Sequence, residues 1–117
     1  MNLKIALLQI APCGTLEKNL EKGIEYCRKA KEMGADIALF PEMWSNGYDI
    51  CERPPEEWKD EAVPGDSEFV HAFGEAAGEL QMAVGITLLE KREEGVCNTL
   101  ILFDRFGKRQ LTYAKVH

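Results

Sequence analysis

The chain has 117 residues, which is the size of one ordinary domain, so a second independent core is not expected. A formal net charge of −6, with no basic cluster, argues against a surface that binds nucleic acid and leaves small or neutral partners open. The longest apolar stretches are too short to cross a bilayer, and the N-terminus is a poor signal peptide, so we expect a cytoplasmic protein without a membrane partner.

The first half of the chain reads as strand, helix, strand. Residues Lys4–Ile10 form a β-rich apolar run that is typical of a strand buried on both faces. Thr15 is predicted to cap a helix that ends near Met33, with Gly34 directly after it, and Asp36–Phe40 is the second predicted strand. The apolar residues of this helix recur at spacings of three and four and predict one buried stripe: Leu16, Leu20, Ile24, Cys27 and Ala30.

A long loop, a second helix and three strands complete the chain. The loop covers residues 45–66, and loops of this length in a compact domain are usually functional or mobile. The helix starts near Asp66 or Ser67 and should bury Phe69, Phe73, Ala76 and Leu80. The remaining elements are a strand at Met82–Leu89, a charged turn at Glu90–Gly95, a strand at Asn98–Phe103, a hairpin connection at Asp104–Gly107 and a strand at Gln110–Val116. This β-α-β-α-β-β-β order predicts an α/β fold with parallel strands first and a hairpin last.

Cysteine and histidine spacing gives no sign of a metal site or a disulfide framework. The four cysteines are scattered without CxxC spacing, at Cys13, Cys27, Cys51 and Cys97. Of the two histidines, His71 reads as a boundary residue of a helix and His117 is the last residue. No glycine-rich phosphate loop occurs either. We therefore expect free thiols that fill apolar gaps, and neither a metal nor a cofactor.

Glu42 is the first candidate for chemistry, because it follows an apolar strand in the stretch DIALFPEMWSNGYDI. The carboxyl edge of a parallel sheet is where functional groups collect. Glu42 is either a solvated loop carboxylate or a general base that Met43, Trp44 and Tyr48 shield from water. We expect Trp44 and Tyr48 to bind substrate. For the two tryptophans, Trp44 and Trp58, the sequence leaves open whether they line a pocket or only anchor the loop.

Lys115 is the second candidate. In TYAKVH it alternates with its neighbours and so shares a face of the strand with Tyr113 and His117, opposite Ala114 and Val116. It is either an edge-strand lysine that discourages aggregation or an ammonium that stabilises an oxyanion in a closed pocket.

Four stretches of the chain resemble the N-terminal part of the carbon–nitrogen hydrolase family, also called the nitrilase superfamily. They are KIALLQIAP, GADIALFPEMWSNGY, MAVGITLLE and NTLILFDRFGKRQLTYAKVH. Their order and rough spacing match the family over essentially the whole chain, and the FPE and Y-x-K-x-H segments are the specific ones. The resemblance implies that residues 1–117 are a β-α-β-α-β-β-β portion of a nitrilase-type αββα sandwich.

The resemblance also implies a Glu-Lys-Cys mechanism for non-peptide C–N bonds. Glu42 matches the family's general base, and Lys115 matches the lysine that stabilises the tetrahedral intermediate. The cysteine attacks the carbon of an amide, a carbamoyl amine or, less commonly, a nitrile, and water hydrolyses the resulting thioester.

The family's nucleophilic cysteine lies downstream of the lysine, and the present chain ends two residues past Lys115. We therefore expect the chain to be the front portion of such an enzyme, truncated before its nucleophile and inactive by itself. A half-sandwich exposes the sheet face that its other half should cover, so we also expect self-association, with a homodimer as the default.

Two other interpretations stay open. One is a non-catalytic assembly or binding module that keeps the fold and lacks the nucleophile. The other is an unrelated small α/β binding domain, in which Glu42 and Lys115 never meet.

Overall fold

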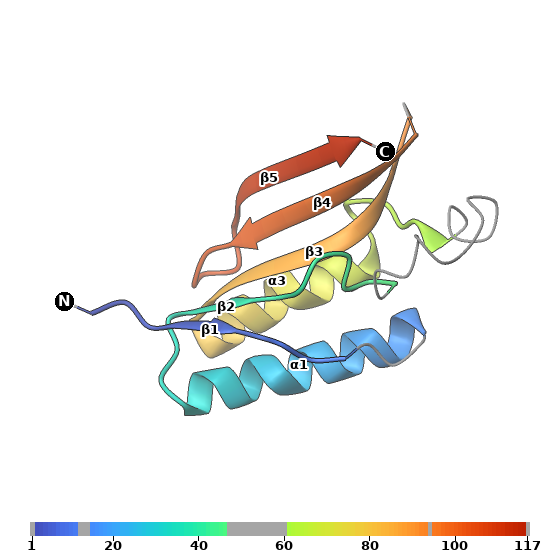
Figure 1. Cartoon of the computed structure of the whole chain (residues 1–117). Helices are drawn as coiled ribbons and strands as arrows, with labels where there is room; N and C mark the ends of the chain where they lie inside the picture. The colour runs from blue at the N-terminus through green and yellow to red at the C-terminus, as the bar shows by residue number, and fades with distance from the viewer. Residues whose placement is uncertain (1, 12–14, 47–60, 94, 117) are drawn as a thin grey trace.

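The computed structural model describes residues 2–11, 15–46, 61–93 and 95–116, in which two helices cover one face of a five-stranded sheet (Figure 1). The elements are β1 (Ile5–Leu7), α1 (Leu16–Glu32), β2 (Ile37–Leu39), α3 (Glu68–Leu80), β3 (Ala83–Arg92), β4 (Gly95–Phe103) and β5 (Arg109–Val116). The predicted order β-α-β-α-β-β-β is therefore confirmed.

The sheet follows the order of the chain, β1-β2-β3-β4-β5. β1 and β2 pair in parallel, as do β2 and β3, whereas β3, β4 and β5 form an antiparallel meander. The parallel units followed by a hairpin are as predicted. Glu42 comes three residues after β2 and thus lies just beyond the carboxyl end of a parallel strand.

The ends of α1 also agree with the sequence. The side chain of Thr15 accepts a hydrogen bond from the Lys18 amide at 3.2 Å, which is the bond expected of an N-cap. Gly34 follows the helix with φ +85°, a conformation that glycine adopts without strain.

The core lies between the helices and the sheet and is built around aromatic rings. Phe73 of α3 is fully buried, and its ring centroid lies 5.1 Å from that of Phe40 and 5.2 Å from that of Phe69. Trp44 joins the cluster at 5.6 Å from Phe40. Centroid separations in this range are those of favourable edge-to-face or tilted ring contacts.

Helix α1 packs on this core along most of the predicted stripe. Cys27 and Ala30 are buried and Leu20 and Ile24 are partly buried, as predicted, whereas Leu16 is exposed. Gly23, which was not in the predicted stripe, is also buried. A Cβ at Gly23 would lie 2.6 Å from the Phe73 ring, so only glycine lets the two helices pack at this distance. α3 buries Phe69, Phe73 and Ala76 as predicted, while Leu80 is half-buried.

Two predictions about the strands were wrong. Lys4–Ile10 was expected to be buried on both faces, yet β1 has three residues and Leu7 is 66% exposed. The reason is that β1 is an edge strand with helices on only one side of it. The charged turn expected at Glu90–Gly95 is shorter than predicted, since β3 continues to Arg92. Glu90 is buried in the strand, where it accepts hydrogen bonds from Arg92 and from Thr99 of β4.

Within the described ranges, none of the helices is long and apolar enough to cross a membrane. The same residues contain no group of three histidine, cysteine, aspartate or glutamate side chains that could hold a metal ion.

Candidate active site on the open face of the sheet

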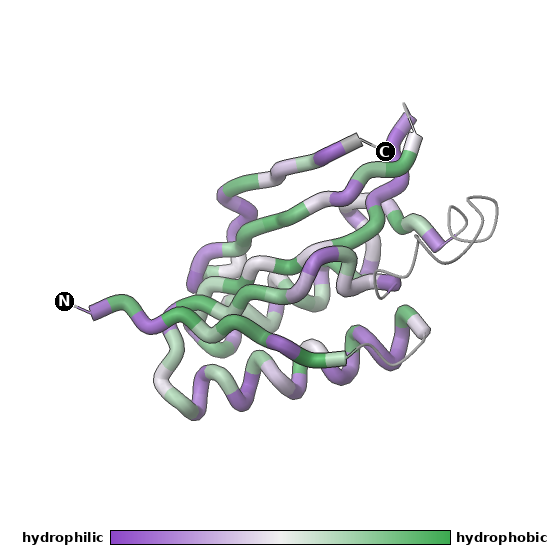
Figure 2. Tube along the Cα trace, viewed as in Figure 1, coloured by the Kyte–Doolittle hydropathy of each residue, from purple (hydrophilic) through white to green (hydrophobic). Residues whose placement is uncertain are grey.

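One face of the sheet is not covered by the helices, and we call it the open face. Alternation along the strands and the observed registers place on it residues that include Ile5, Leu7, Ile37, Leu39, Gly85, Thr87, Leu89, Asn98, Leu100, Leu102, Leu111, Tyr113 and Lys115. Figure 2 shows hydrophobic residues concentrated in the strands and hydrophilic residues along much of α1. The open face is therefore mostly apolar, and its polar side chains stand out.

A cavity of about 350 Å³ lies on this face at the carboxyl end of β2. Its lining is formed by both apolar and polar residues: Leu39, Phe40, Glu42, Thr87, Asn98, Thr99, Leu100, Tyr113 and Lys115. The two residues predicted to carry chemistry, Glu42 and Lys115, thus border the same cavity.

Glu42 reaches the cavity from the turn that follows β2, and its carboxylate has a polar partner there. The Nδ2 amide of Asn98 donates a hydrogen bond to Glu42 Oε1. A carboxylate accepts several such bonds, so an amide on one oxygen fixes the direction of the group and leaves lone pairs for a proton transfer. Glu42 itself is exposed in the described chain.

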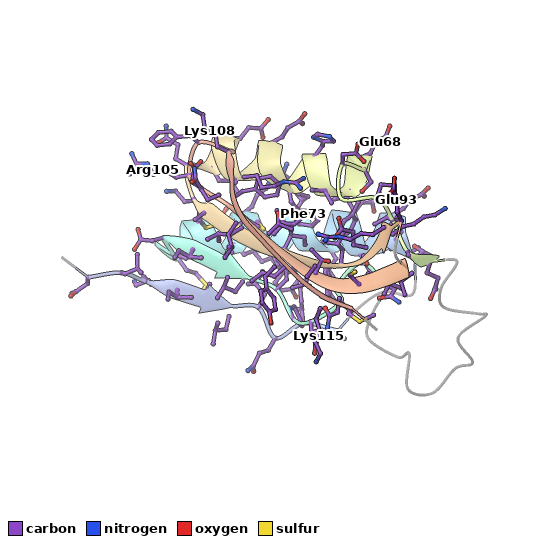
Figure 3. The ribbon with its side chains drawn as sticks, turned by 90° about the horizontal axis from the view of Figure 1, so that it is seen from above. Glu68, Phe73, Glu93, Arg105, Lys108 and Lys115 are labelled. Atoms are coloured by element: carbon purple, nitrogen blue, oxygen red, sulfur yellow. The ribbon has the colours of Figure 1, made fainter. Side chains whose placement is uncertain are left out.

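Lys115 enters the cavity from β5, and the register shows why. Asn98 is paired with Lys115 across β4 and β5, and Leu100 is paired with Tyr113 on the same face. Directly opposite residues of an antiparallel pair have side chains close together. Figure 3 shows Lys115 on the side of the sheet opposite α3. Asn98 therefore lies between Glu42, which it contacts, and Lys115, which is its cross-strand neighbour.

Asn98 was not singled out from the sequence, although it is only 8% exposed and contacts the candidate base. One signal was available, because the strand NTLILF begins with polar residues and is otherwise apolar. Thr99, the next residue, points to the opposite face and contacts Glu90, so alternation assigns Asn98 to the open face.

The structure does not bring Trp44 to this cavity. Trp44 is 1% exposed, lies in the core and donates a hydrogen bond from Nε1 to the backbone oxygen of Asn19 at 3.0 Å. Met43 is fully buried and packs against Leu89, and Glu42 nevertheless stays exposed, in contrast to the shielding that we expected. Tyr48, Trp58 and His117 lie outside the described residues. His71 is exposed on α3, away from the cavity lining.

Two of the cysteines can be placed, and neither faces the cavity. Cys97 and Cys27 are fully buried; Cys97 precedes Asn98 in β4 and so points to the helix side of the sheet. Burial raises the pKa of the Cys27 thiol from its ordinary value of 9.0 to about 12, which suppresses the nucleophilic thiolate. Both thiols fill the core, as predicted. Cys13 and Cys51 lie outside the described residues.

Comparison with known proteins finds one matching family and several similar proteins. A family model described as carbon-nitrogen hydrolase matches residues 4–117. The chain is 28% identical to the omega-amidase NIT2 of Bos taurus over 115 residues, which are 97% of this chain and 40% of that protein. It is also 41% identical over 56 residues, 47% of the chain, to a glutamine-dependent NAD(+) synthetase of Thermotoga maritima, of which this segment is 9%.

Solved structures agree at the level of the fold. A carbon-nitrogen hydrolase from Helicobacter pylori G27 superposes with a TM-score of 0.82 at 22% identity, over 98% of this chain and 40% of that chain. An amidase from Nesterenkonia sp. superposes with a TM-score of 0.76 at 24% identity, over 98% of this chain and 43% of that one. The chain therefore spans less than half the length of these proteins.

Proposed function

The chain belongs to the carbon–nitrogen hydrolase family, and on that premise we propose that it carries the base and the cation of a Glu-Lys-Cys site for small amide-type substrates. The observation that carries this proposal is that Glu42 and Lys115 border the same cavity. Asn98 is hydrogen-bonded to Glu42 and is paired with Lys115 across β4 and β5. This arrangement also favours an enzyme site over an unrelated binding domain in which the two residues are apart.

In the proposed first step, Glu42 removes the proton of a cysteine thiol, and the thiolate attacks the carbonyl carbon of the substrate. The carbonyl oxygen gains negative charge as the tetrahedral intermediate forms, and the Lys115 ammonium stabilises that charge. Glu42 then gives its proton to the departing nitrogen, so that ammonia or an amine leaves and a thioester remains. The same carboxylate activates the water that hydrolyses the thioester to a carboxylic acid and regenerates the thiol.

The nucleophile of this scheme is not one of the two described cysteines, since Cys27 and Cys97 are buried on the helix side of the sheet. By the family resemblance it belongs to sequence downstream of Lys115. We therefore propose that residues 1–117 alone do not turn over substrate.

Among C–N bonds, we propose that carboxamides are the substrate class rather than nitriles. The names of the relatives support this choice, since an omega-amidase and amidases are among the matched proteins. The apolar lining from Leu39, Leu100 and Tyr113 fits a short aliphatic or uncharged substrate body beside the polar reacting group.

Ammonia release from a panel of small carboxamides, carbamoyl amines and nitriles tests the proposal. The gene product that contains the downstream cysteine should release ammonia from carboxamides, whereas residues 1–117 alone should stay at the background rate. Robust turnover by residues 1–117 would refute the assignment of the nucleophile. A complete gene product that binds amides and releases no ammonia would favour the non-catalytic module.

A further inference from the structure

The turn that presents Glu42 begins where ordinary strand pairing stops. The Phe40 amide donates to the Gly85 oxygen at 3.0 Å. Within residues 40–46, it is the last amide that donates a hydrogen bond to the backbone of β3. The next residue is Pro41, which has no N–H to donate. From this point the backbone of residues 41–45 needs other partners to keep a fixed position over β3.

Thr87 of β3 supplies these partners from its side chain. Its hydroxyl donates to the backbone oxygen of Pro41 and accepts a hydrogen bond from the Trp44 amide at 3.0 Å. These two backbone groups enclose Glu42 and Met43, so one side chain ties both ends of the turn that bears the carboxylate. Thr87 is 7% exposed, and the turn passes through Met43 at φ +55°, a conformation that a non-glycine residue adopts only when its surroundings impose it.

A second hydroxyl, carried by the turn itself, also binds the turn to β3. Ser45 Oγ accepts a hydrogen bond from the Leu89 amide at 2.9 Å, two residues further along β3, and Ser45 is buried. Hydroxyl side chains thus bind two backbone groups of the segment, the Pro41 oxygen and the Trp44 amide, and one backbone group of β3, the Leu89 amide. Because these side chains are short, the hydrogen-bond geometry tolerates little displacement of the segment.

We propose that Thr87 is a positioning residue for Glu42: its hydroxyl sets the backbone of the turn so that the carboxylate meets Asn98 and the cavity. The inference rests on the proposed function for its catalytic meaning, while its structural content stands on the hydrogen bonds alone. A β-branched residue is suited to the strand, and of the β-branched residues only threonine can both donate and accept at this place. Loss of the hydroxyl would leave the Trp44 amide and the Pro41 oxygen without this partner and let the turn move.

The test compares Thr87→Val, which keeps the shape and removes the hydroxyl, with Thr87→Ser, which keeps the hydroxyl. Thr112→Val, on the exposed strand β5, is the matched control for the same chemical change. Hydrogen exchange of the Trp44 backbone amide in the full chain should accelerate about tenfold or more in Thr87→Val, and should stay close to the unmodified rate in Thr87→Ser and Thr112→Val. Unchanged exchange at Trp44 in a folded Thr87→Val chain, judged by the Ile101 amide in the core, would overturn the proposal.

Hydrogen exchange of the unmodified chain is a second test, and it does not depend on whether a variant folds. Its Trp44 amide should exchange far more slowly than an unstructured amide, and exchange at the unstructured rate would overturn the proposal too. In a gene product that hydrolyses amides, Thr87→Val should lower kcat by about tenfold to a hundredfold with little change in KM, and Thr87→Ser should restore it. The exchange measurement does not depend on turnover, so failure of the positioning role and failure of the proposed function give different results.

Discussion

Replacing Glu42 by glutamine should lower kcat for carboxamide hydrolysis by about a thousandfold or more in the complete enzyme. A glutamine keeps the size of the side chain and can still accept the hydrogen bond from Asn98, but it cannot take the proton of a thiol. General bases contribute about 10²–10⁴ in rate, and Glu42 is proposed to act in both halves of the reaction. The measurement is steady-state ammonia release at saturating substrate.

Glu79→Gln makes the same change of charge on the exposed surface of α3 and serves as the matched control. It should leave kcat within about twofold, because surface substitutions away from a site have small effects. Activity of Glu42→Gln above about a tenth of the unmodified rate would remove Glu42 from the role of general base.

The second large effect concerns association of the 117-residue chain, which we propose to occur through the open face. Leu7 on β1 and Leu111 and Tyr113 on β5 are 66%, 51% and 65% exposed on this face, and exposed apolar surface favours self-association. Leu111→Lys should weaken the dimer by about tenfold or more, because it removes apolar area from the contact and requires a charge to be desolvated. Sedimentation velocity over a concentration series measures the change.

Met33→Lys is the control for association, since Met33 is 76% exposed at the end of α1, on the helix side of the molecule, and the substitution changes the net charge by the same amount. Met33→Lys should sediment like the unmodified chain. A monodisperse monomer at high concentration in the unmodified chain would contradict the proposed association.

Much of the fold follows from local patterns in the sequence. The strands and helices were predicted in their correct order because apolar periodicity and caps such as Thr15 are local signals. The position of Glu42 past the end of a strand followed from Pro41, and the face of Lys115 followed from alternation with Ala114. Each of these inferences needs only neighbouring residues.

The parts that the sequence did not predict depend on distant partners. Trp44 turns into the core because the backbone at Met43 adopts φ +55° and Thr87 holds the turn there, and no pattern within the loop encodes this. The contact of Asn98 with Glu42 depends on the relative register of β3 and β4, which joins residues 56 positions apart. The exposure of β1 depends on which strand becomes the edge of the sheet, a property of the topology rather than of the strand.

The positions of the polar side chains on the open face are consistent with the chemistry that we propose. The open face brings one carboxylate, one amide and one ammonium to a cavity in otherwise apolar surroundings. An ammonium held beside the reacting carbonyl stabilises the oxyanion that forms there, and this is the role proposed for Lys115. The proposed active site requires that Glu42, Asn98 and Lys115 form one cluster.

Nuclear Overhauser spectroscopy of the isotope-labelled chain tests that claim most directly. The side-chain amide protons of Asn98 should show cross-peaks to the γ protons of Glu42, and the β protons of Asn98 should show them to the side chain of Lys115. These cross-peaks follow from the amide–carboxylate hydrogen bond and from the cross-strand pairing. A folded chain in which Asn98 shows cross-peaks to neither Glu42 nor Lys115 would contradict the account.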